Sequence, residues 1–443
     1  MNLPKNVLYC IRQLEAAGYQ AYAVGGCVRD SLLGLTPADY DLCTSAKPEE
    51  ICQVFAAHQL LHHGEKHGTV SVVLDSQVYE ITTFRTEGGY EDARHPGWVD
   101  FVSHVEEDLA RRDFTVNAMA YNPTTGYVDP FGGQQDMQNH ILRAVGDPEI
   151  RFQEDALRIL RGARFSARFR LVPEAATMNA MTSLTPLLDK IARERVFEEL
   201  CKLLMHATAQ DLLTFAPLLT QVIPELLPCV GFAQHNPHHR YDVFTHIAYV
   251  VESVPAVLEL RWAALLHDVG KPACFTQDAE GKGHFLGHAK ISLEMADEIL
   301  LRLKAPTALR QQVTELIGLH MTKLEPDKKL LRRRIGKLGP EGLEQLLILQ
   351  EADMGSKGTG KTVEMDQFPL IRQLVAEILA ENACFSIKDL AVNGQHLQQA
   401  GLRPGPRMGQ CLSWLLEQVQ DEALPNDHDT LLKAAKEFWE EKE

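Results

Sequence analysis

The spacing of apolar residues changes near residue 147, and this change limits the fold more than any other feature. Before it, the spacing predicts helices over 6–17 and 28–33 and strands over 21–24, 69–74 and 78–83. After it, strand patterns nearly vanish and helical spacing continues to the C-terminus. An α+β head followed by a long all-α body is therefore expected.

Charge and cysteine content exclude several classes of protein. The formal charge of −16, from 60 acidic and 44 basic residues, argues against indiscriminate nucleic-acid binding but permits a local basic face. No apolar run approaches the roughly 18 residues that span a bilayer, and residues 1–13 carry no secretory signal. None of the nine cysteines forms a Cys-x-x-Cys pair. We expect a cytoplasmic protein with reduced thiols and no membrane partner.

A glycine pair and two carboxylates stand out in the head. Residues 25–30 read Gly-Gly-Cys-Val-Arg-Asp, where a predicted strand meets a helix. Free backbone N–H groups at such a junction bind phosphate, and glycine allows close approach. Asp39 and Asp41 follow; on a strand they would share one face, about 7 Å apart. Two carboxylates so placed can hold a pair of Mg²⁺ ions for in-line phosphoryl transfer.

Arginines cluster in two further blocks, Arg-Arg-Asp-Phe-Thr-Val-Asn-Ala at 111–118 and Glu-Asp-Ala-Leu-Arg at 154–158. The spacing predicts helices over 112–120 and 154–169. On the second helix, Arg158, Arg161 and Arg164 would form one ridge, with Asp155 one turn before Arg158. Residues 151–170 hold six arginines against two acids, which favours contact with phosphate in an acidic chain.

These four blocks, in this order, resemble those of class II CCA-adding tRNA nucleotidyltransferases, whose head is shared with bacterial poly(A) polymerases. The resemblance is strongest over residues 20–200 and implies a polymerase-beta-like nucleotidyltransferase head. It implies that Asp39 and Asp41 hold catalytic Mg²⁺, that CTP and ATP are substrates, and that tRNA is the partner. The nucleotide-binding residues it implies are Gly26, Arg29, Arg112, Glu154, Asp155, Arg158, Arg161 and Arg164.

The resemblance assigns base selection to Asp155 and Arg158, with Glu154 orienting the arginine. A carboxylate only accepts hydrogen bonds and a guanidinium only donates them. Cytosine and adenine each offer an amino donor beside a ring-nitrogen acceptor, which matches this pair. Uracil and guanine offer the reverse, and each unpaired polar group costs about 1–3 kcal/mol. The pair therefore predicts that CTP and ATP are accepted and that UTP and GTP are rejected.

Two segments bear on the type of addition. Residues 63–70, His-Gly-Glu-Lys-His-Gly-Thr-Val, resemble the CCA-adding form of this strand more than the poly(A) polymerase form. Residues 86–101 resemble the flexible loop with which full CCA-adding enzymes switch from CTP to ATP, although His95 stands where the family usually has a second basic residue before Pro96. Full CCA addition is expected, with A-only addition and poly(A) tailing as alternatives.

A second set of candidate ligands lies in the helical body: His246, His267, Asp268, His288, His320 and Asp353. Imidazole with carboxylate suits a divalent transition metal, and also Mg²⁺ or Mn²⁺. Adjacent residues of a helix point about 100° apart, so distant ligands must complete each ion. This order resembles the HD phosphohydrolase superfamily. It implies hydrolysis of a phosphoester, such as a 2′,3′-cyclic or terminal phosphate on damaged RNA ends.

Three other segments have weaker interpretations. Residues 355–362 match the P-loop pattern but follow a predicted helix, so we interpret them as a linker. Residues 327–337 contain six basic residues and one acidic residue. This segment is either a solvated helix face or a surface that contacts RNA phosphates. The glycine-rich turns at 393–409 resemble the tRNA-binding tail of CCA-adding enzymes, with a packing hairpin as the alternative.

We therefore predict a nucleotidyltransferase head (1–145), a helical neck that contributes to nucleotide selection and RNA binding (146–225), an HD phosphohydrolase domain (226–355) and a helical, tRNA-binding tail (356–443). The predicted function is CCA addition with a second, phosphohydrolase activity. Two rival functions are a metal-dependent phosphohydrolase whose head only holds RNA, and a non-catalytic RNA-binding protein.

Overall fold

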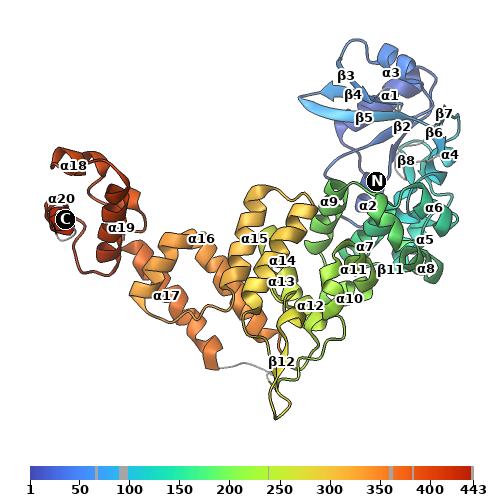
Figure 1. The fold of residues 1–443 in the computed structure, drawn as a ribbon. Coiled ribbons are helices and arrows are strands. Elements are labelled where there is room, and N and C mark those ends of the chain that lie inside the picture. The colour runs from blue at the N-terminus through green and yellow to red at the C-terminus, as the bar shows by residue number, and fades with distance from the viewer. Residues whose placement is uncertain (65–67, 89–97, 238, 359–362, 382–383, 441–443) are drawn as a thin grey trace. The chain divides into compact units, whose positions relative to one another are not determined.

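Seven strands of the head form one sheet in the computed structural model (Figure 1), in the order β3-β4-β5-β2-β1-β8-β9. Neighbouring strands are antiparallel except β2 and β5, which are parallel. The strands are β1 (Ala21–Val24), β2 (Leu42–Thr44), β3 (Gln59–Gly64), β4 (Thr69–Leu74), β5 (Gln77–Thr83), β8 (Ala120–Asn122) and β9 (Gly126–Val128). The predicted α+β head with a helical body is confirmed.

The structure describes residues 1–64, 68–88, 98–237, 239–358, 363–381 and 384–440. The chain divides into two compact units. The N-terminal unit comprises residues 1–227 and 302–304, and the C-terminal unit comprises residues 228–301 and 305–443. Among the described residues, no helix has both the length and the apolar character needed to cross a membrane.

Helices cover both faces of the sheet. Helix α1 (Lys5–Ala16) buries Val7, Cys10, Ile11 and Leu14, the spacing of one apolar helical stripe. It packs with α3 (Pro48–Val54) on the face to which Ala21 and Ala23 point. On the other face, Val24 and Phe84 form a core with residues of α4 (Val105–Ala110).

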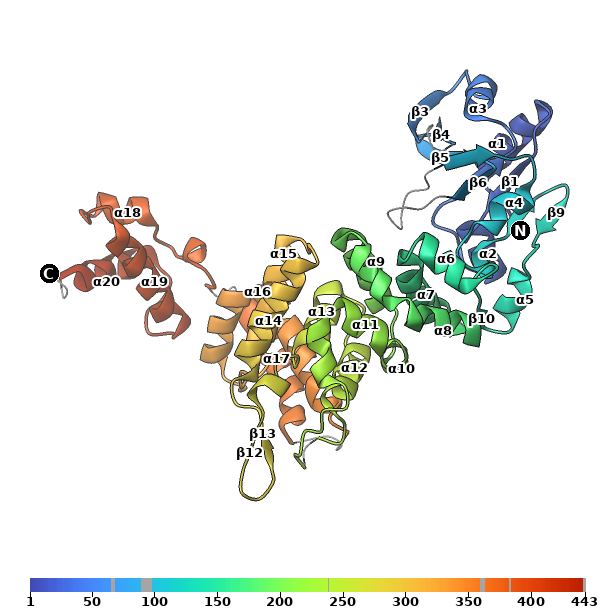
Figure 2. The ribbon, with the colours of Figure 1, turned by 45° about the vertical axis from the view of Figure 1, so that its right-hand side comes forward.

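The rest of the N-terminal unit is mostly helical (Figure 2). A hairpin of β6 (Arg85–Gly88) and β7 (Trp98–Phe101) forms the two ends of the predicted flexible loop, whose residues 89–97 lie outside the described chain, as do residues 65–67 of the motif at 63–70. The helices are α2 (Gly26–Leu32), α5 (Gly133–Gln138), α6 (Pro148–Glu154), α7 (Leu157–Phe169), α8 (Ala175–Ser183), α9 (Arg193–Leu204), α10 (Ala209–Thr214) and α11 (Ala216–Val222), and a short pair joins β10 (Ile141–Leu142) to β11 (Val172–Pro173).

The C-terminal unit is built almost entirely from helices. Its one strand pair is β12 (Thr276–Gln277) with β13 (Gly283–His284) among the residues the structure describes. Helix α16 bends where Gly339 adopts φ 71° before Pro340. The helices are α12 (Val243–Ser253), α13 (Leu258–Leu266), α14 (His288–Arg302), α15 (Thr307–Leu319), α16 (Lys328–Gly355), α17 (Gln367–Ala380), α18 (Gly394–Gln399), α19 (Pro406–Gln420) and α20 (His428–Glu440).

The helix predicted over 112–120 is wrong. Only one 3₁₀ turn forms, at Thr115–Asn117, and β8 begins at Ala120. Side chains explain the difference, because the Thr115 hydroxyl donates to Asp136 and the Asn117 amide donates to Asp113, 2.7 and 3.0 Å away. These contacts compete with regular helical hydrogen bonding.

The basic segment 327–337 has partners within its own unit. Four of its six bases form ion pairs with acids of neighbouring segments. The pairs are Lys328 with Glu377 and Glu381, Lys329 with Asp421, Arg332 with Glu381 and Glu422, and Arg333 with Asp421. The segment thus contributes to holding α16 against α17 and the end of α19. Of the P-loop-like residues, Gly355 ends helix α16 and 356–358 follow it, whereas a P-loop would follow a strand. Residues 359–362 lie outside the described chain.

Candidate functional site

The paired carboxylates of the head lie just before a strand. The sequence predicted Asp39 and Asp41 on a strand, but β2 begins at Leu42, so this detail is wrong. Both side chains are open to solvent and line one cavity with Glu80. Crowding around Asp41 raises the pKa of its carboxyl, through partial desolvation and then the charge of Asp39.

Glu80 is a functional candidate that the sequence reasoning missed. Strands β2 and β5 run parallel with Leu42 opposite Ile81, so Asp41 lies beside Glu80. Glu80 is exposed between the buried Tyr79 and Ile81, and its charge also raises the pKa of Asp41. A carboxylate on the open face of a strand was visible in the sequence, but the pairing of β2 with β5 was not.

Asp41 also lines a second cavity, of about 430 Å³. Gly25 and Gly26 line it where β1 enters α2, together with Asp113 and Asp155. Eight arginines complete its wall, a large excess of positive charge: Arg29, Arg111, Arg112, Arg158, Arg161, Arg164, Arg168 and Arg195. Such a cavity suits a polyanion such as a nucleoside triphosphate.

The helix predicted over 154–169 is interrupted. Helix α6 ends at Glu154, Asp155 is extended (φ −139°, ψ 101°), and α7 begins at Leu157. The carboxylate of Asp155 accepts from the backbone N–H of Leu157 at 3.0 Å, a local hydrogen bond that favours a helix start over continuation. Asp155 and Arg158 still line the same cavity.

Arg158 is held firmly. Its Nη1 donates to Glu154 at 2.8 Å and to the carbonyl of Arg151 at 3.1 Å, and its Nη2 donates to the carbonyl of Arg111 at 2.9 Å. Contacts with the described residues thus use three of its five N–H donors, which leaves two for a bound group. Only 8% of Arg158 is exposed, so the side chain has a fixed direction.

Asp155 has a partner that the sequence did not reveal. Arg195, from the start of α9, donates to its Oδ2 at 3.2 Å. A carboxylate offers about four lone-pair positions, so it can still accept from a ligand. The contact spans 40 residues of sequence and depends on tertiary packing, which no local pattern indicates.

Asp113 fixes one of the arginines that line this cavity. It is buried, and it accepts two hydrogen bonds from Arg161, at 2.8 and 2.6 Å. Burial alone would raise its pKa, but the charge of Arg161 and the hydrogen bond from Asn117 lower it well below the usual range. Arg29 donates to Asp30 and to Asn117, which fixes its guanidinium across the ring of Phe169.

Arg164 is the arginine whose ionisation the cavity perturbs most clearly. It donates to Glu199 at 3.2 Å and lies 4.4 Å from the centre of the Phe165 ring. Burial lowers its pKa to about 10, so it stays positively charged at neutral pH.

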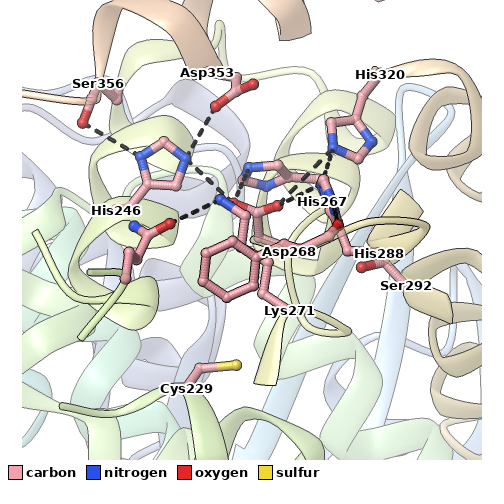
Figure 3. Close-up of polar contacts among 12 residues, drawn as sticks. Cys229, His246, His267, Asp268, Lys271, His288, Ser292, His320, Asp353 and Ser356 are labelled. Atoms are coloured by element: carbon pink, nitrogen blue, oxygen red, sulfur yellow. Dashed lines mark hydrogen bonds and ion pairs between the residues drawn. The ribbon is translucent and has the colours of Figure 1, made fainter. Parts of the chain in front are cut away.

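The six candidate ligands of the C-terminal unit converge on one point (Figure 3). His246 comes from α12, His267 and Asp268 follow α13, His288 starts α14, His320 follows α15 and Asp353 lies in α16. Asp268 is central: its Oδ2 lies 3.4 Å from His246 Nε2 and 3.2 Å from His267 Nε2, and its Oδ1 lies 3.3 Å from His288 Nε2. The ligand atoms form two groups, His246–His267–Asp268 and Asp268–His288–His320, which share Asp268.

The backbone fixes the direction of every imidazole. The Nδ1 atoms of His246, His267, His288 and His320 lie 3.3, 2.8, 2.8 and 2.6 Å from the carbonyl oxygens of Ser356, Ala264, Phe285 and Ile317. A carbonyl only accepts, so each Nδ1 carries a proton and each Nε2 is the nitrogen turned into the cluster around Asp268. Protein metal sites hold their histidines in this way.

The residues present fit divalent metal ions. Nε2 of His246 and Nε2 of His267 are buried and have no hydrogen-bond partner among the described residues. Burial would lower the pKa of His246, but Asp268 and Asp353 raise it to about 9, so a proton there supplies positive charge. Burial lowers the pKa of His320 to about 4, which leaves its imidazole neutral. Imidazole with carboxylate is a donor set for Mn²⁺, Fe²⁺, Ni²⁺ or Zn²⁺.

Family models match three parts of the chain. A model described as the poly A polymerase head domain matches residues 21–143. One described as a probable RNA and SrmB-binding site of polymerase A matches residues 169–229. One described as a putative tRNA nucleotidyltransferase domain 2 matches residues 275–435.

Whole proteins resemble the chain along nearly its full length. The CCA-adding enzyme of Limosilactobacillus fermentum is 35% identical over 97% of this chain and 95% of its own. The CCA-adding enzyme of Streptococcus gordonii is 35% identical over 98% of this chain and 97% of its own. The crystal structure of the Bacillus stearothermophilus CCA-adding enzyme in complex with CTP has a TM-score of 0.75, with 28% identity over 100% of this chain and 99% of that one. The Thermotoga maritima CCA-adding enzyme complexed with tRNA shares the fold (TM-score 0.58, 19% identity, 98% and 94% covered).

Proposed function

Since this chain belongs to the family of CCA-adding enzymes, we propose that it adds C, C and A to the 3′ end of tRNA, using CTP and ATP without a nucleic-acid template. The observation that carries the proposal is one cavity that joins an arginine wall to Asp155, Arg158 and the catalytic candidate Asp41. The primer 3′-hydroxyl gives up its proton to water and its oxygen bonds to the α-phosphorus. The bond from that phosphorus to the oxygen bridging to the β-phosphate breaks, and pyrophosphate leaves with that oxygen.

Asp39 and Asp41 are proposed to hold Mg²⁺, with Glu80 as a third carboxylate. Carboxylate oxygens are the ligands that Mg²⁺ prefers, and the pKa of Asp41 is raised by partial desolvation and then by the charge of Asp39, both of which a bound cation would offset. When bound, Mg²⁺ offsets charge at the reacting phosphate and favours ionisation of the attacking hydroxyl. Arg29, Arg112, Arg161 and Arg164 bind the triphosphate, and Gly26 lets it approach the backbone.

Asp155 and Arg158 are proposed to select the base. The two N–H donors that Arg158 keeps free meet the ring nitrogen of cytosine or adenine, and Asp155 accepts from the amino group. Glu154 positions Arg158 through its 2.8 Å hydrogen bond. The test is extension of a tRNA ending in C with each nucleotide alone. CTP should extend it and UTP and GTP should not, whereas equal use of UTP would contradict the assignment. Use of ATP only, on tRNA ending in CC, would indicate the A-adding alternative.

Gly25 gives a prediction about the arginine wall. It has φ +75°, and a Cβ there would lie 2.7 Å from Nη1 of Arg112. In Gly25→Ala the guanidinium must move, and we expect the KM for CTP to rise about tenfold, the order of one weakened charged hydrogen bond. Steady-state extension kinetics measure it.

Gly34→Ala is the matched control for Gly25→Ala. Gly34 follows the same helix with φ +73°, but a Cβ there meets nothing within 4 Å. Alanine at Gly34 therefore adds a side chain at a positive φ, at a backbone cost of about 1–2 kcal/mol, without displacing Arg112. An equal rise of KM in both variants would show that backbone strain, not the arginine, is responsible.

We propose metal-dependent hydrolysis of a phosphoester as a second activity, at the centre around Asp268. Two ligand groups that share one carboxylate favour it, because paired metal sites serve phosphoryl chemistry. His246, His267, Asp268 and Asp353 would hold one ion, and Asp268, His288 and His320 the other. The test is hydrolysis of p-nitrophenyl phosphate by the full chain with Mn²⁺, Ni²⁺ or Mg²⁺. Inactivity with every metal would overturn this second activity and leave the first untouched.

A further inference from the structure

We infer that Lys357, together with His239, binds the phosphoryl group of the substrate beside the Asp268 centre. The inference rests on the second activity proposed above. It adds two residues that lie outside the candidate metal ligands. Neither had a role in the sequence analysis, where residue 357 was part of the P-loop-like linker.

A cavity of about 220 Å³ opens directly beside the centre. Its lining includes three candidate metal ligands, Asp268, His288 and Asp353. It also includes three residues outside that set, Lys271, Lys357 and His239. At about 30 Å³ per water, it holds the equivalent of roughly seven waters, enough for a phosphoryl group and the first atoms of its ester. Divalent ions at the candidate ligands, together with the ammonium groups of Lys271 and Lys357, would make the cavity positively charged. It would therefore favour an anion.

The two lysines differ in how they are engaged. Lys271 is buried; its Nζ lies 2.7 Å from Asp268 Oδ2 and 3.0 Å from Gln234 Oε1. Lys357 is half-buried, and its ammonium forms no hydrogen bond or ion pair with a described residue, although its charge lowers the pKa of Asp353. A lysine at a cavity wall with an unengaged ammonium is available to a ligand, whereas Lys271 already serves Asp268.

The backbone around Lys357 is fixed, so its side chain starts from a defined position. Its carbonyl accepts from the N–H of Arg240 at 2.9 Å. Gly358 (φ +75°) packs so closely on Tyr241 that a Cβ would lie 2.7 Å from the ring. The lysine is thereby anchored next to the segment that carries His239.

His239 supplies an independent observation. Its Nδ1 is buried and has no hydrogen-bond partner among the described residues. Buried polar atoms are nearly always paired, so an unpaired one at a cavity wall indicates a missing ligand or water. A phosphoryl oxygen would accept from this nitrogen while another meets the ammonium of Lys357.

The experiment titrates inorganic phosphate into the Mn²⁺-loaded full chain by calorimetry. Lys357→Met should weaken phosphate binding about tenfold or more, the order expected for one charged hydrogen bond, and Lys357→Arg should restore most of it. His239→Gln should weaken it less. Bound manganese, measured by mass spectrometry, should stay equal in all variants. Lys323→Met is the control, since it removes the same charge near His320 from a side chain that is 76% exposed and paired with Glu325.

The outcomes separate the inference from the activity on which it rests. Where p-nitrophenyl phosphate is hydrolysed, Lys357→Met should raise KM far more than it lowers kcat, because a binding contact is lost. Unchanged KM and phosphate affinity in Lys357→Met would overturn the inference while the activity stands. Without any hydrolysis the activity fails, and the phosphate titration still decides the role of Lys357. Absence of phosphate binding by the wild-type chain overturns the inference.

Discussion

Asp41→Asn is expected to lower the rate of nucleotide addition at least about 10³-fold without destabilising the protein. A loss of about 4 kcal/mol of transition-state stabilisation gives this factor, and metal ligands contribute on this scale. The raised pKa of Asp41 means that its charge is unfavourable in the folded chain at neutral pH. Removing the charge should therefore leave the thermal midpoint equal or slightly higher. Extension kinetics and calorimetry measure the two effects.

Glu49→Gln is the matched control for Asp41→Asn. Glu49 is an exposed acid in the first turn of α3, in the same unit and away from both cavities of the head. It should leave addition nearly unchanged. Asp41→Asn with full activity would show that the carboxylates before β2 are not catalytic, and would favour the alternative in which the head only holds RNA.

Asp268→Ala is expected to abolish hydrolysis of p-nitrophenyl phosphate and to lower metal affinity at least about 100-fold. Asp268 belongs to both ligand groups, so its loss damages both. Replacing a residue that only hydrogen-bonds a metal ligand lowers metal affinity about 10–100-fold. Loss of a ligand itself should therefore lower it at least about 100-fold. Metal content after dialysis, measured by mass spectrometry, tests this directly.

His288→Ala separates the two ligand groups. It removes a ligand from only one of them and should leave one tightly held ion. CCA addition should stay within about twofold of wild type in both variants, since substitutions in separate units act independently. Wild-type metal content in Asp268→Ala would contradict the assignment of this centre.

Local patterns predicted much of the fold. The predictions for β1, for the first helix and for the helices of the body agree with the structure because apolar spacing is a property of adjacent turns. The two failed helices lie where polar side chains compete with the backbone. The Asp155 carboxylate accepts from the backbone N–H of Leu157 at the start of α7, and Asp113 and Asp136 hold the turn at 115–117.

Contacts between distant segments could not be predicted. Glu80 lies beside Asp41 only because β2 pairs with β5, and Arg195 meets Asp155 across 40 residues. Lys357 and His239 share a cavity through the docking of residues 357–358 on 240–241. In each case the sequence shows which residue is present but not which distant residue lies beside it in the fold.

The most direct test of the central claim is the sequence of the product. A tRNA that ends at the discriminator base is incubated with the purified chain, Mg²⁺, CTP and ATP, and its 3′ end is sequenced. Three added nucleotides, C, C and A in that order, followed by arrest, are expected. No extension, or an unlimited run of A, would contradict the central claim.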